Sequence, residues 1–432
     1  MNAKSMTGDI SSMTIRKDFL TLTPADEFNR LLAGHAVATP PETLETVDAV
    51  GRVAAQDIPS PEQVPRFFRS TVDGYAVISD DTHGAGSSIP VYLDLAGEIP
   101  VGAPAHISLE SGQSVRVVTG GAVPTEADAV VMQEHTDLID ETTLEIRKGV
   151  GHLENVIVPG EDIEKGDVLV RRGTRLRPHD IGALYAAGIC RLPVHTRPQV
   201  ALFSTGDEIV EPDRIPPEGC MRDINKYALS AAVIQAGGAP VRFENMPDDL
   251  DAVTKTIARG VKESDLVVLS GGSSVGAKDF TLSAIDALGK PGVLVHGIAV
   301  KPGKPTIFGI VDDTPIVGLP GHPMGALVIF LAFIVPFIRR IGGESDPTPF
   351  PSRTTAVLQR SVPGSPGRRT YIPVSLAEVD GTDVPAATPI LGKSGIITTM
   401  MTSHGLLAIP ENREGYAKGD MVTIFRYADI VG

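Results

Sequence analysis

The pattern of apolar and polar positions changes along the chain, and residues 197–344 carry its clearest form. Short apolar runs such as Val200–Phe203 and Leu266–Leu269 alternate there with longer segments such as Tyr227–Gln235 and Leu250–Val261. Short continuous apolar runs are typical of strands buried on both faces, and their alternation with helical segments predicts parallel strands joined by crossover helices. We therefore predict a doubly wound α/β domain over this region.

The regions that flank the α/β segment have a different pattern. From about residue 80 to 160, short strand-like runs are separated by Gly and Pro, and no run of helical length and period interrupts them. Helical patterns at 23–36 and 178–187 surround this block, and strand-like runs return after Gly343. The predicted fold class is therefore α/β plus β, with two β-rich domains among four. The expected domains are residues 14–60 with 160–196, residues 61–159, residues 197–344 and residues 345–432.

The longest apolar run is Met324–Ile338, which has 15 residues and contains Pro336. A membrane-spanning helix needs about 20 residues, so we expect a buried helix and no membrane association. The first 13 residues are polar and lack the apolar segment of a signal peptide.

Composition excludes several classes of protein. The chain of 432 residues has a formal charge of −15, whereas nucleic-acid binding requires a basic face, so no nucleic-acid partner is expected. Its two cysteines, Cys190 and Cys220, have no partner at metal-binding spacing, which argues against a disulfide framework or a zinc site. We expect a protein of the reducing cytoplasm.

The strongest candidate site is Asp265–Phe280, where a predicted buried strand runs into a turn of Ser and Gly. Ligands of α/β sheets bind beyond the carboxyl ends of the strands, and Gly271, Gly272 and Gly276 allow close approach of the backbone to an anion. Asp279 follows on the first turn of the next helix, and a divalent cation is the usual bridge between a phosphate and such a carboxylate. The alternative is a tight turn without a ligand.

Two further segments add ligand-binding chemistry to the predicted α/β domain. The turn after Val200–Phe203 contains Asp207 and Glu208, and Lys301 and Lys304 are held between prolines around one Gly. Together with the Gly turn, they suit a phosphorylated or nucleotide ligand with Mg²⁺ and a second anion. The alternative for the lysines is a solvated loop with spare charges. With no defensible Ser–His–Asp pattern and no nucleophilic Cys, catalysis by positioning and electrostatics is expected.

Asp73 and Thr119 stand beside glycines in the β-rich region before the α/β segment. Asp73 precedes Gly74, a pair most often found in plain turns, and Thr119 begins a second Gly-rich turn directly after a predicted strand. The residues alone favour the turn interpretation for Asp73.

The order of the motifs is more specific than any one of them. The chain contains, in sequence, STVDGYA (70–76), TGGAVP (119–124), PGED (159–162), STGDE (204–208), RDIN (222–225), SGGSSVGAKDF (270–280), KPGKP (301–305) and GLPGHP (318–323). In this order they closely resemble the molybdopterin molybdenumtransferase family, which is similar to the gephyrin E domain. The resemblance covers the chain from about residue 15.

The resemblance implies an elongated homodimer of four-domain subunits. It also implies a reaction in which molybdate and adenylylated molybdopterin give molybdenum cofactor and AMP, with Mg²⁺ as cofactor. The pterin's own sulfurs would capture the metal, so no protein cysteine is required. Molybdopterin adenylyltransferase and molybdoenzymes are the implied transient partners.

The resemblance also implies roles for individual residues. Asp73 and Thr119 would act at the dimer cleft, so Asp73 would have a function beyond forming a turn. One of Asp248 or Asp249 would also be functional. Glu208 and Asp279 would hold Mg²⁺. The implied catalytic residues are Asp73, Thr119, Asp162, Glu208, Asp249 and Asp279. The implied substrate-binding residues are Gly271, Gly272, Ser273, Ser274, Lys301, Lys304, Pro305, Pro323, Arg368 and Ser394.

The chain departs from the family pattern at four positions. Val72 replaces a Met, His322 an Asn, Gly325 a Ser and Pro373 an Arg. The last three fall at or near the expected oxyanion pocket, so tungstate use or a paralogue with an altered role stays open. Two further alternatives are molybdopterin adenylyltransferase activity, because that enzyme has a similar α/β domain, and a binding protein without catalysis.

Overall fold

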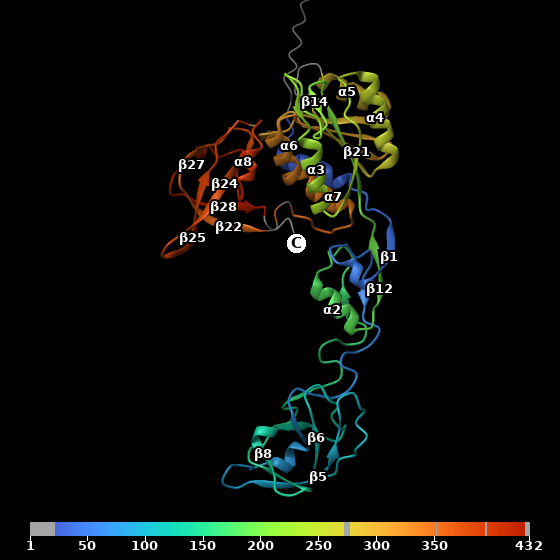
Figure 1. Ribbon diagram of the computed structural model, residues 1–432, viewed down its shortest axis with the longest axis vertical. Coiled ribbons are helices and arrows are strands. Elements are labelled where there is room, and N and C mark those ends of the chain that lie inside the picture. The colour runs from blue at the N-terminus through green and yellow to red at the C-terminus, as the bar shows by residue number, and fades with distance from the viewer. Residues whose placement is uncertain (1–21, 272–276, 349, 351, 394, 428–432) are drawn as a thin grey trace, which may run out of the picture. The chain divides into compact units, whose positions relative to one another are not determined.

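The computed structural model describes residues 22–271, 277–348, 350, 352–393 and 395–427, except for the side chains of residues 277–279 (Figure 1). Contacts divide the chain into two compact units. Unit 1 comprises Met1–Pro41 and His195–Gly432, and unit 2 comprises Glu42–Val194.

The centre of unit 1 is a six-stranded sheet with the strand order β16-β13-β17-β21-β20-β18. Strands β16, β13, β17 and β21 are parallel, as the alternation of apolar runs predicts. The strands are β13 (Gln199–Thr205), β16 (Ala239–Arg242), β17 (Leu266–Gly271), β18 (Pro291–His296), β20 (Ile307–Val311) and β21 (Thr314–Leu319). The helices between them are α3 (Asn225–Gln235), α4 (Leu250–Glu263) and α5 (Ala277–Leu288).

Strand β20 runs antiparallel to both of its neighbours, which differs from a fully parallel sheet. Only Asp312 and Asp313 connect β20 to β21, and both have positive φ angles, 47° and 64°. A two-residue turn with two positive φ angles forms a tight hairpin, whereas a parallel connection needs a dozen or more residues. Because the connection has only two residues, β20 and β21 must run antiparallel.

The long apolar segment after β21 is one helix, Pro323–Ile341, with three parts. These are α6 (Pro323–Ile329), the π-helical turn η4 (Phe330–Ile334) and α7 (Val335–Ile341). The π turn stands directly before Pro336, where an α-helix would lose a hydrogen bond and bring the ring against an earlier carbonyl. The helix is long and apolar enough to cross a membrane, but 83% of its most apolar window is buried in the protein, as the sequence led us to expect for a core helix.

A β-barrel follows in the chain and shares the core of unit 1. Strands β24, β25, β22, β28 and β26 pair in that order, and β26 pairs again with β24, which closes the barrel. The barrel contributes Tyr371, Met400 and Leu406 to the core around the long helix. The remaining elements of unit 1 beyond the sheet are β14 (Ile209–Val210), β15 (Met221–Arg222), β19 (Val300–Lys301), β22 (Arg353–Leu358), β23 (Val362–Pro363), β24 (Arg369–Val379), β25 (Thr382–Pro389), α8 (Thr398–Met401), β26 (Gly405–Ile409), β27 (Gly415–Tyr416) and β28 (Met421–Arg426).

Unit 1 also contains the first helix, α1 (Ala25–Gly34), which the expected domains group with residues 160–196. Phe28 of α1 is fully buried, and its ring lies 6.1 Å from that of Phe308 and 5.5 Å from that of Phe333. The apolar face of α1 thus packs on the α/β core rather than with the 178–187 helix.

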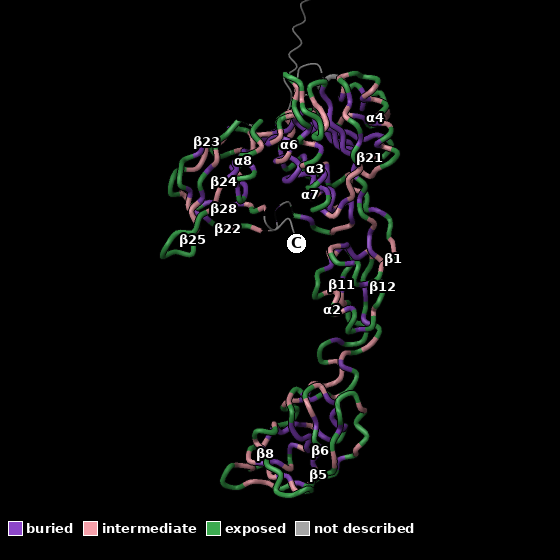
Figure 2. The backbone as a smooth tube through the Cα atoms, viewed as in Figure 1, coloured by how far each residue is buried: buried purple, intermediate pink, exposed green. Residues whose placement is uncertain are grey.

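Unit 2 contains a second six-stranded sheet, with the order β7-β4-β6-β5-β9-β8. Figure 2 shows buried residues within this sheet and exposed residues in the loops around it. A separate core includes α2 (Pro178–Ala186) and residues from both ends of the unit. The other elements are β1 (Pro41–Glu45), η1 (Thr46–Ala49), β2 (Ile58–Pro59), β3 (Arg69–Ser70), β4 (Gly74–Val77), η2 (Ser79–Thr82), β5 (Val91–Glu98), β6 (Gln113–Val117), β7 (Ala129–Met132), η3 (Gln133–His135), β8 (Thr136–Leu138), β9 (Thr143–Ile146), β10 (Val156–Ile157), β11 (Val168–Val170) and β12 (Arg191–His195).

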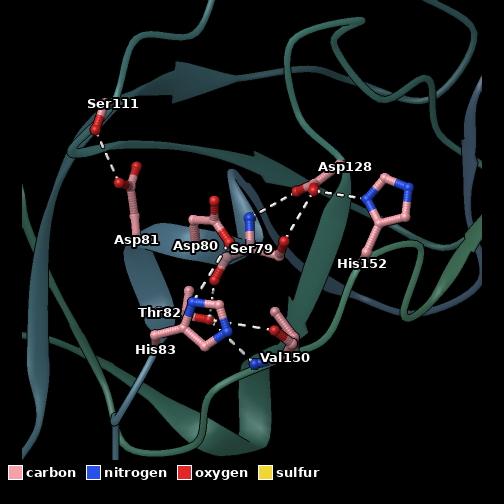
Figure 3. Close-up of polar contacts among 9 residues, drawn as sticks. All are labelled: Ser79, Asp80, Asp81, Thr82, His83, Ser111, Asp128, Val150 and His152. Atoms are coloured by element: carbon pink, nitrogen blue, oxygen red, sulfur yellow. Dashed lines mark hydrogen bonds and ion pairs between the residues drawn. The ribbon is translucent and has the colours of Figure 1, made fainter.

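A polar cluster in unit 2 joins η2 to the loop around residue 150 (Figure 3). Asp128 accepts hydrogen bonds from the Ser79 N–H at 2.6 Å, the Ser79 hydroxyl at 2.8 Å and His152 Nδ1 at 2.8 Å. Burial raises the pKa of Asp128, but the bonds from His152 and Ser79 outweigh it and lower the pKa. Both Ser79 and His152 contact the carboxylate, whereas a catalytic triad needs Ser to contact His. The cluster therefore stabilises two loops.

Candidate functional site

The candidate site lies at the carboxyl ends of β13 and β17. From β13 the chain passes first to β16 on one side and then to β17 on the other, so the strand order reverses between β13 and β17. Such a reversal leaves a crevice at the strand ends, which is where α/β sheets bind ligands. A cavity of about 370 Å³ occupies this place. Its lining residues are Ser204, Thr205, Glu208, Ile209, Met221, Arg222, Asp223, Ile224, Asn225, Ser270, Gly271, Gly321, His322, Pro323 and Gly395.

Gly271 closes the strand at the cavity and cannot carry a side chain there. Its φ angle is 139°, and a Cβ atom on it would lie 2.3 Å from the Thr205 carbonyl oxygen. Gly206 has a similar constraint, because a Cβ there would lie 2.7 Å from the Glu208 carboxylate. The two glycines therefore allow the β13 and β17 ends to approach each other and Glu208 to fold back over the turn.

Three carboxylates gather beside this turn: Asp207, Glu208 and Asp248. One Asp248 oxygen, Oδ1, is buried and accepts no hydrogen bond among the described residues. Burial, followed by the charges of Asp207 and Glu208, raises the pKa of Asp248. A carboxylate in this state lacks a positive partner.

Asp249, the sequence-predicted member of the Asp248–Asp249 pair, has a different role in the structure. Its carboxylate caps α4 by accepting a hydrogen bond from the Ala252 N–H at 2.9 Å. Capping of this kind stabilises a helix by about 1 kcal/mol. Of the two acids, Asp248 therefore lies with the other carboxylates, while Asp249 supports the helix that follows.

Several predicted site residues fall outside the described parts of the chain. Gly272, Ser273, Ser274 and Ser394 are among them, and of Asp279 only the position in α5 is described. Among the described side chains, no group of three His, Cys, Asp or Glu is arranged to hold a metal ion.

A buried lysine joins the segments that form the cavity wall. Lys226 is 2% exposed, and its ammonium donates to Glu211 at 2.6 Å, to Asn245 Oδ1 at 2.7 Å and to the Phe243 carbonyl at 3.2 Å. These partners come from the segment after Glu208 and from the segment before Asp248. Sequence reasoning missed Lys226, Asp223 and Ser204 as site residues, although RDIN (222–225) and the polar turn at 204 were recognised as motifs. A lysine directly after RDIN at the start of an apolar helix was the available signal.

Three of the predicted substrate-binding residues, Lys301, Lys304 and Arg368, lie on two neighbouring segments of unit 1. Strand β19 pairs with β24, so Lys301 stands beside Thr370, two residues after Arg368. Gly303 between the two lysines has a φ angle of 119°, and a Cβ on it would lie 2.3 Å from Ile329 on the long helix. The turn is therefore fixed against the helix.

The other predicted residues near this turn differ in exposure and in their contacts. Lys304 is exposed, and its carbonyl accepts a hydrogen bond from the Ile298 N–H at 3.0 Å. Pro305 is partly buried. Pro323 begins α6 and lines the cavity. Arg369, next to Arg368, forms ion pairs with Glu411 at 3.2 Å and Asp26 at 3.0 Å.

Asp73 and Thr119 of unit 2 form a close pair. One Asp73 oxygen accepts hydrogen bonds from the Thr119 N–H at 2.7 Å and from its hydroxyl at 2.9 Å. The backbone bond is the main reason for the lowered pKa of Asp73, and the hydroxyl bond is the second. Both residues are exposed, as is Asp162, whose N–H donates to the Val64 carbonyl at 3.1 Å. Of these three predicted residues, Asp73 and Thr119 are therefore in direct contact.

Comparison with known proteins gives matches over nearly the whole chain. Residues 22–188 match the MoeA N-terminal region (domain I and II), residues 201–340 a probable molybdopterin binding domain, and residues 355–426 the MoeA C-terminal region (domain IV). A molybdopterin molybdenumtransferase 2 from Mycobacterium tuberculosis is 33% identical over 404 residues, covering 92% of this chain and 98% of that protein. A molybdopterin molybdenumtransferase from Bacillus subtilis is 30% identical over 405 residues, covering 93% of each.

The fold has a similarly broad match among solved structures. The crystal structure of a molybdopterin biosynthesis MoeA protein from Pyrococcus horikoshii OT3 aligns with a TM-score of 0.78 and 30% identity. The alignment covers 94% of this chain and 100% of that one.

Proposed function

Because the chain belongs to the MoeA family of molybdopterin molybdenumtransferases, which are enzymes of molybdenum cofactor biosynthesis, we propose that it inserts molybdenum into adenylylated molybdopterin. In the proposed reaction, molybdate and adenylylated molybdopterin give molybdenum cofactor and AMP. The pterin's dithiolene sulfurs replace two oxygens of molybdate. An oxygen from molybdate or water forms the new bond to phosphorus as the bond between the pterin phosphate and AMP breaks, and one water is released overall.

The observation that carries this proposal is the cavity where the strand order reverses. Its volume of about 370 Å³ is within the range for organic ligands, roughly 300–1,000 Å³. The backbone of Gly271 and the carboxylate of Glu208 line the same cavity. A site that places the backbone of a cavity-lining glycine beside a carboxylate suits a phosphorylated ligand that arrives with a cation.

The carboxylates beside the cavity offer oxygen atoms, the ligands that Mg²⁺ prefers, but the described side chains alone do not form a complete metal site. Asp248 has a buried oxygen that accepts no hydrogen bond from the described residues, and it has a raised pKa. A nearby cation would relieve both features. Glu208 and Asp248 would hold the ion, and Asp279 remains a predicted ligand. Bound Mg²⁺ would neutralise charge on the phosphate groups. Gly271 and Glu208 would position the ligand within the cavity.

The lysine turn and the Arg368 segment support an oxyanion site. Pairing of β19 with β24 brings these two cationic segments to neighbouring positions, as a tetrahedral dianion requires. Lys301, Lys304 and Arg368 would supply charge, and Pro305, Pro323 and Ser394 remain predicted members. We also propose a cytoplasmic homodimer, with the adenylyltransferase and molybdoenzymes as transient partners.

The test is release of AMP from adenylylated molybdopterin with Mg²⁺, measured with and without molybdate or tungstate. We expect oxyanion-dependent release, and we expect Glu208→Gln to lower it at least tenfold. Glu218→Gln is the matched control, because Glu218 is exposed and does not line the cavity. Release that does not depend on an oxyanion would reject the proposal, and so would transfer of AMP from ATP to molybdopterin.

A further inference from the structure

Two polar atoms of the cavity residues have no hydrogen-bond partner among the described residues. They are Oδ2 of Asp223 and Oγ of Ser204. Asp223 is 5% exposed, Ser204 is 3% exposed, and both line the cavity. A buried polar atom without a partner costs about 1–3 kcal/mol, and more when it is charged. Such atoms at the wall of a cavity point to a ligand that completes their hydrogen bonds.

The neighbouring polar groups are already satisfied. The Asn225 side-chain amide donates to Ser270 Oγ at 2.6 Å and to the Gly321 carbonyl at 2.8 Å. The other oxygen of Asp223, Oδ1, accepts from the Lys226 N–H at 3.0 Å. Asp223 is therefore held by one oxygen, while the second accepts no hydrogen bond from the described residues.

The charge of Lys226 limits the kind of ligand group that can bind beside Asp223. Its ammonium lies 3.6 Å from Asp223 Oδ2, close enough for an ion pair but beyond hydrogen-bond distance. Its three N–H donors already have Glu211, Asn245 and the Phe243 carbonyl as partners. The ammonium disfavours a second cation beside Asp223, and the carboxylate disfavours a phosphate. A neutral N–H donor meets both conditions.

We propose that Asp223 and Ser204 form a subsite that recognises the N–H edge of a fused nitrogen heterocycle. Asp223 Oδ2 accepts a hydrogen bond from an amino group of the heterocycle, Ser204 Oγ forms a second hydrogen bond to the same edge, and Lys226 positions the carboxylate. This inference rests on the proposed function, whose substrate has two heterocycles with amino groups, a pterin and an adenine. Asp223 is thus a specificity-determining residue, and Lys226 is a positioning residue.

The experiment compares ligands that differ in one amino group. Binding of pterin and of lumazine, which lacks the 2-amino group, is measured by fluorescence with the full-length protein. Binding of AMP and of inosine monophosphate, which lacks the adenine amino group, is measured by calorimetry. We expect the wild-type protein to prefer the amino-bearing ligand of at least one pair by tenfold or more, because hydrogen bonds to charged groups are the stronger ones.

Two variants test whether Asp223 and Ser204 cause the preference for amino-bearing ligands. We expect Asp223→Asn to abolish the preference and Ser204→Ala to reduce it several-fold. Tyr227→Phe is the matched control, because Tyr227 donates to Glu211 at 2.7 Å in the same network but does not line the cavity. If Asp223→Asn does not fold, Ser204→Ala alone decides, since it removes only one hydroxyl.

Each outcome bears on the proposal. Loss of preference in the pterin pair assigns the subsite to the pterin, and loss in the AMP pair assigns it to adenine. Equal binding within both pairs, or an unchanged preference in both variants, overturns the subsite. A wild-type protein that prefers pterin through Asp223 but shows no oxyanion-dependent AMP release would retain the subsite and reject the proposed function.

Discussion

Two aspartates of the candidate chemistry are in opposite electrostatic states. Asp73 in unit 2 is exposed, receives two hydrogen bonds from Thr119 and has a lowered pKa. Asp248 in unit 1 is partly buried, has an oxygen that accepts no hydrogen bond from any residue that the structure describes, and has a raised pKa. Thr119 thus satisfies Asp73 from a neighbouring loop, whereas no described residue donates a hydrogen bond to Oδ1 of Asp248.

The difference shows how the same residue type can serve two purposes. A carboxylate that is already hydrogen-bonded keeps its charge and its position before any ligand arrives. A carboxylate crowded by like charges raises the free energy of the empty site, and a cation that binds there relieves it. The predictions below test this contrast.

The largest loss of folding stability is expected from substitution of the glycines near Asp73 and beside the cavity. A Cβ atom on Gly74, next to Asp73, would lie 2.0 Å from the Val131 carbonyl, and one on Gly271 would lie 2.3 Å from the Thr205 carbonyl. We expect Gly74→Ala and Gly271→Ala each to destabilise the protein by about 3 kcal/mol, measured by urea unfolding.

The control for these glycines is Gly182→Ala. Gly182 lies in α2, has no atom within 4 Å of its added Cβ and has a helical backbone. Alanine there is expected to be neutral or to stabilise by about 0.5–1 kcal/mol. A stable Gly271→Ala protein with an intact cavity would contradict the close approach of β13 to β17.

A smaller effect is expected from Mg²⁺. At 100 times its dissociation constant, the ion should stabilise the wild-type protein by about 2.7 kcal/mol, measured as a rise in the unfolding midpoint. Glu208→Gln and Asp248→Asn should lose most of this gain, and Glu218→Gln should retain it. Equal stabilisation of all four proteins would place the ion elsewhere.

The Thr119 hydroxyl is expected to have a local effect on the other aspartate. Thr119→Val removes the hydroxyl donor but keeps the backbone N–H, so the pKa of Asp73 should rise towards its ordinary value without reaching it. Carboxyl NMR titration measures the change. Thr142→Val is a matched control, because Thr142 donates from both its N–H and its hydroxyl to Asp140 in a separate turn. In Thr142→Val, a pKa change at Asp140 alone shows that the assay detects such bonds. An unchanged pKa of Asp73 in Thr119→Val would then refute the role of the Thr119 hydroxyl.

The smallest effect is the pH dependence of Asp248. Its raised pKa means that the folded protein keeps this proton to a higher pH than the unfolded chain, so stability falls as the pH rises between the two pKa values. Asp248→Asn should therefore be more stable than the wild-type protein at pH 7, and the difference should vanish below the ordinary pKa of 3.8. Unfolding at both pH values without Mg²⁺ provides the measurement, and a less stable variant at pH 7 would contradict the crowding of charges.

The sequence was sufficient for the elements of the α/β region, because buried strands and amphipathic helices have distinct periods. It could not place α1, since an apolar helix face does not specify the surface that covers it. For the site, Gly271 and Glu208 were predictable from strand-end chemistry. The division of roles between Asp248 and Asp249 depended on which carboxylate caps α4, and the burial of Lys226 depended on three segments that are distant in sequence.

The long helix Pro323–Ile341 has a consequence for synthesis of the protein on the ribosome. All six strands of the α/β sheet precede it in the chain, so they are available when this apolar segment leaves the exit tunnel. Tyr371, Met400 and Leu406, which share its core, emerge later. During that interval part of the segment has no native cover, and exposed apolar surface of this kind promotes aggregation. The nascent chain would therefore depend most on chaperones between the appearance of Ile341 and that of Leu406.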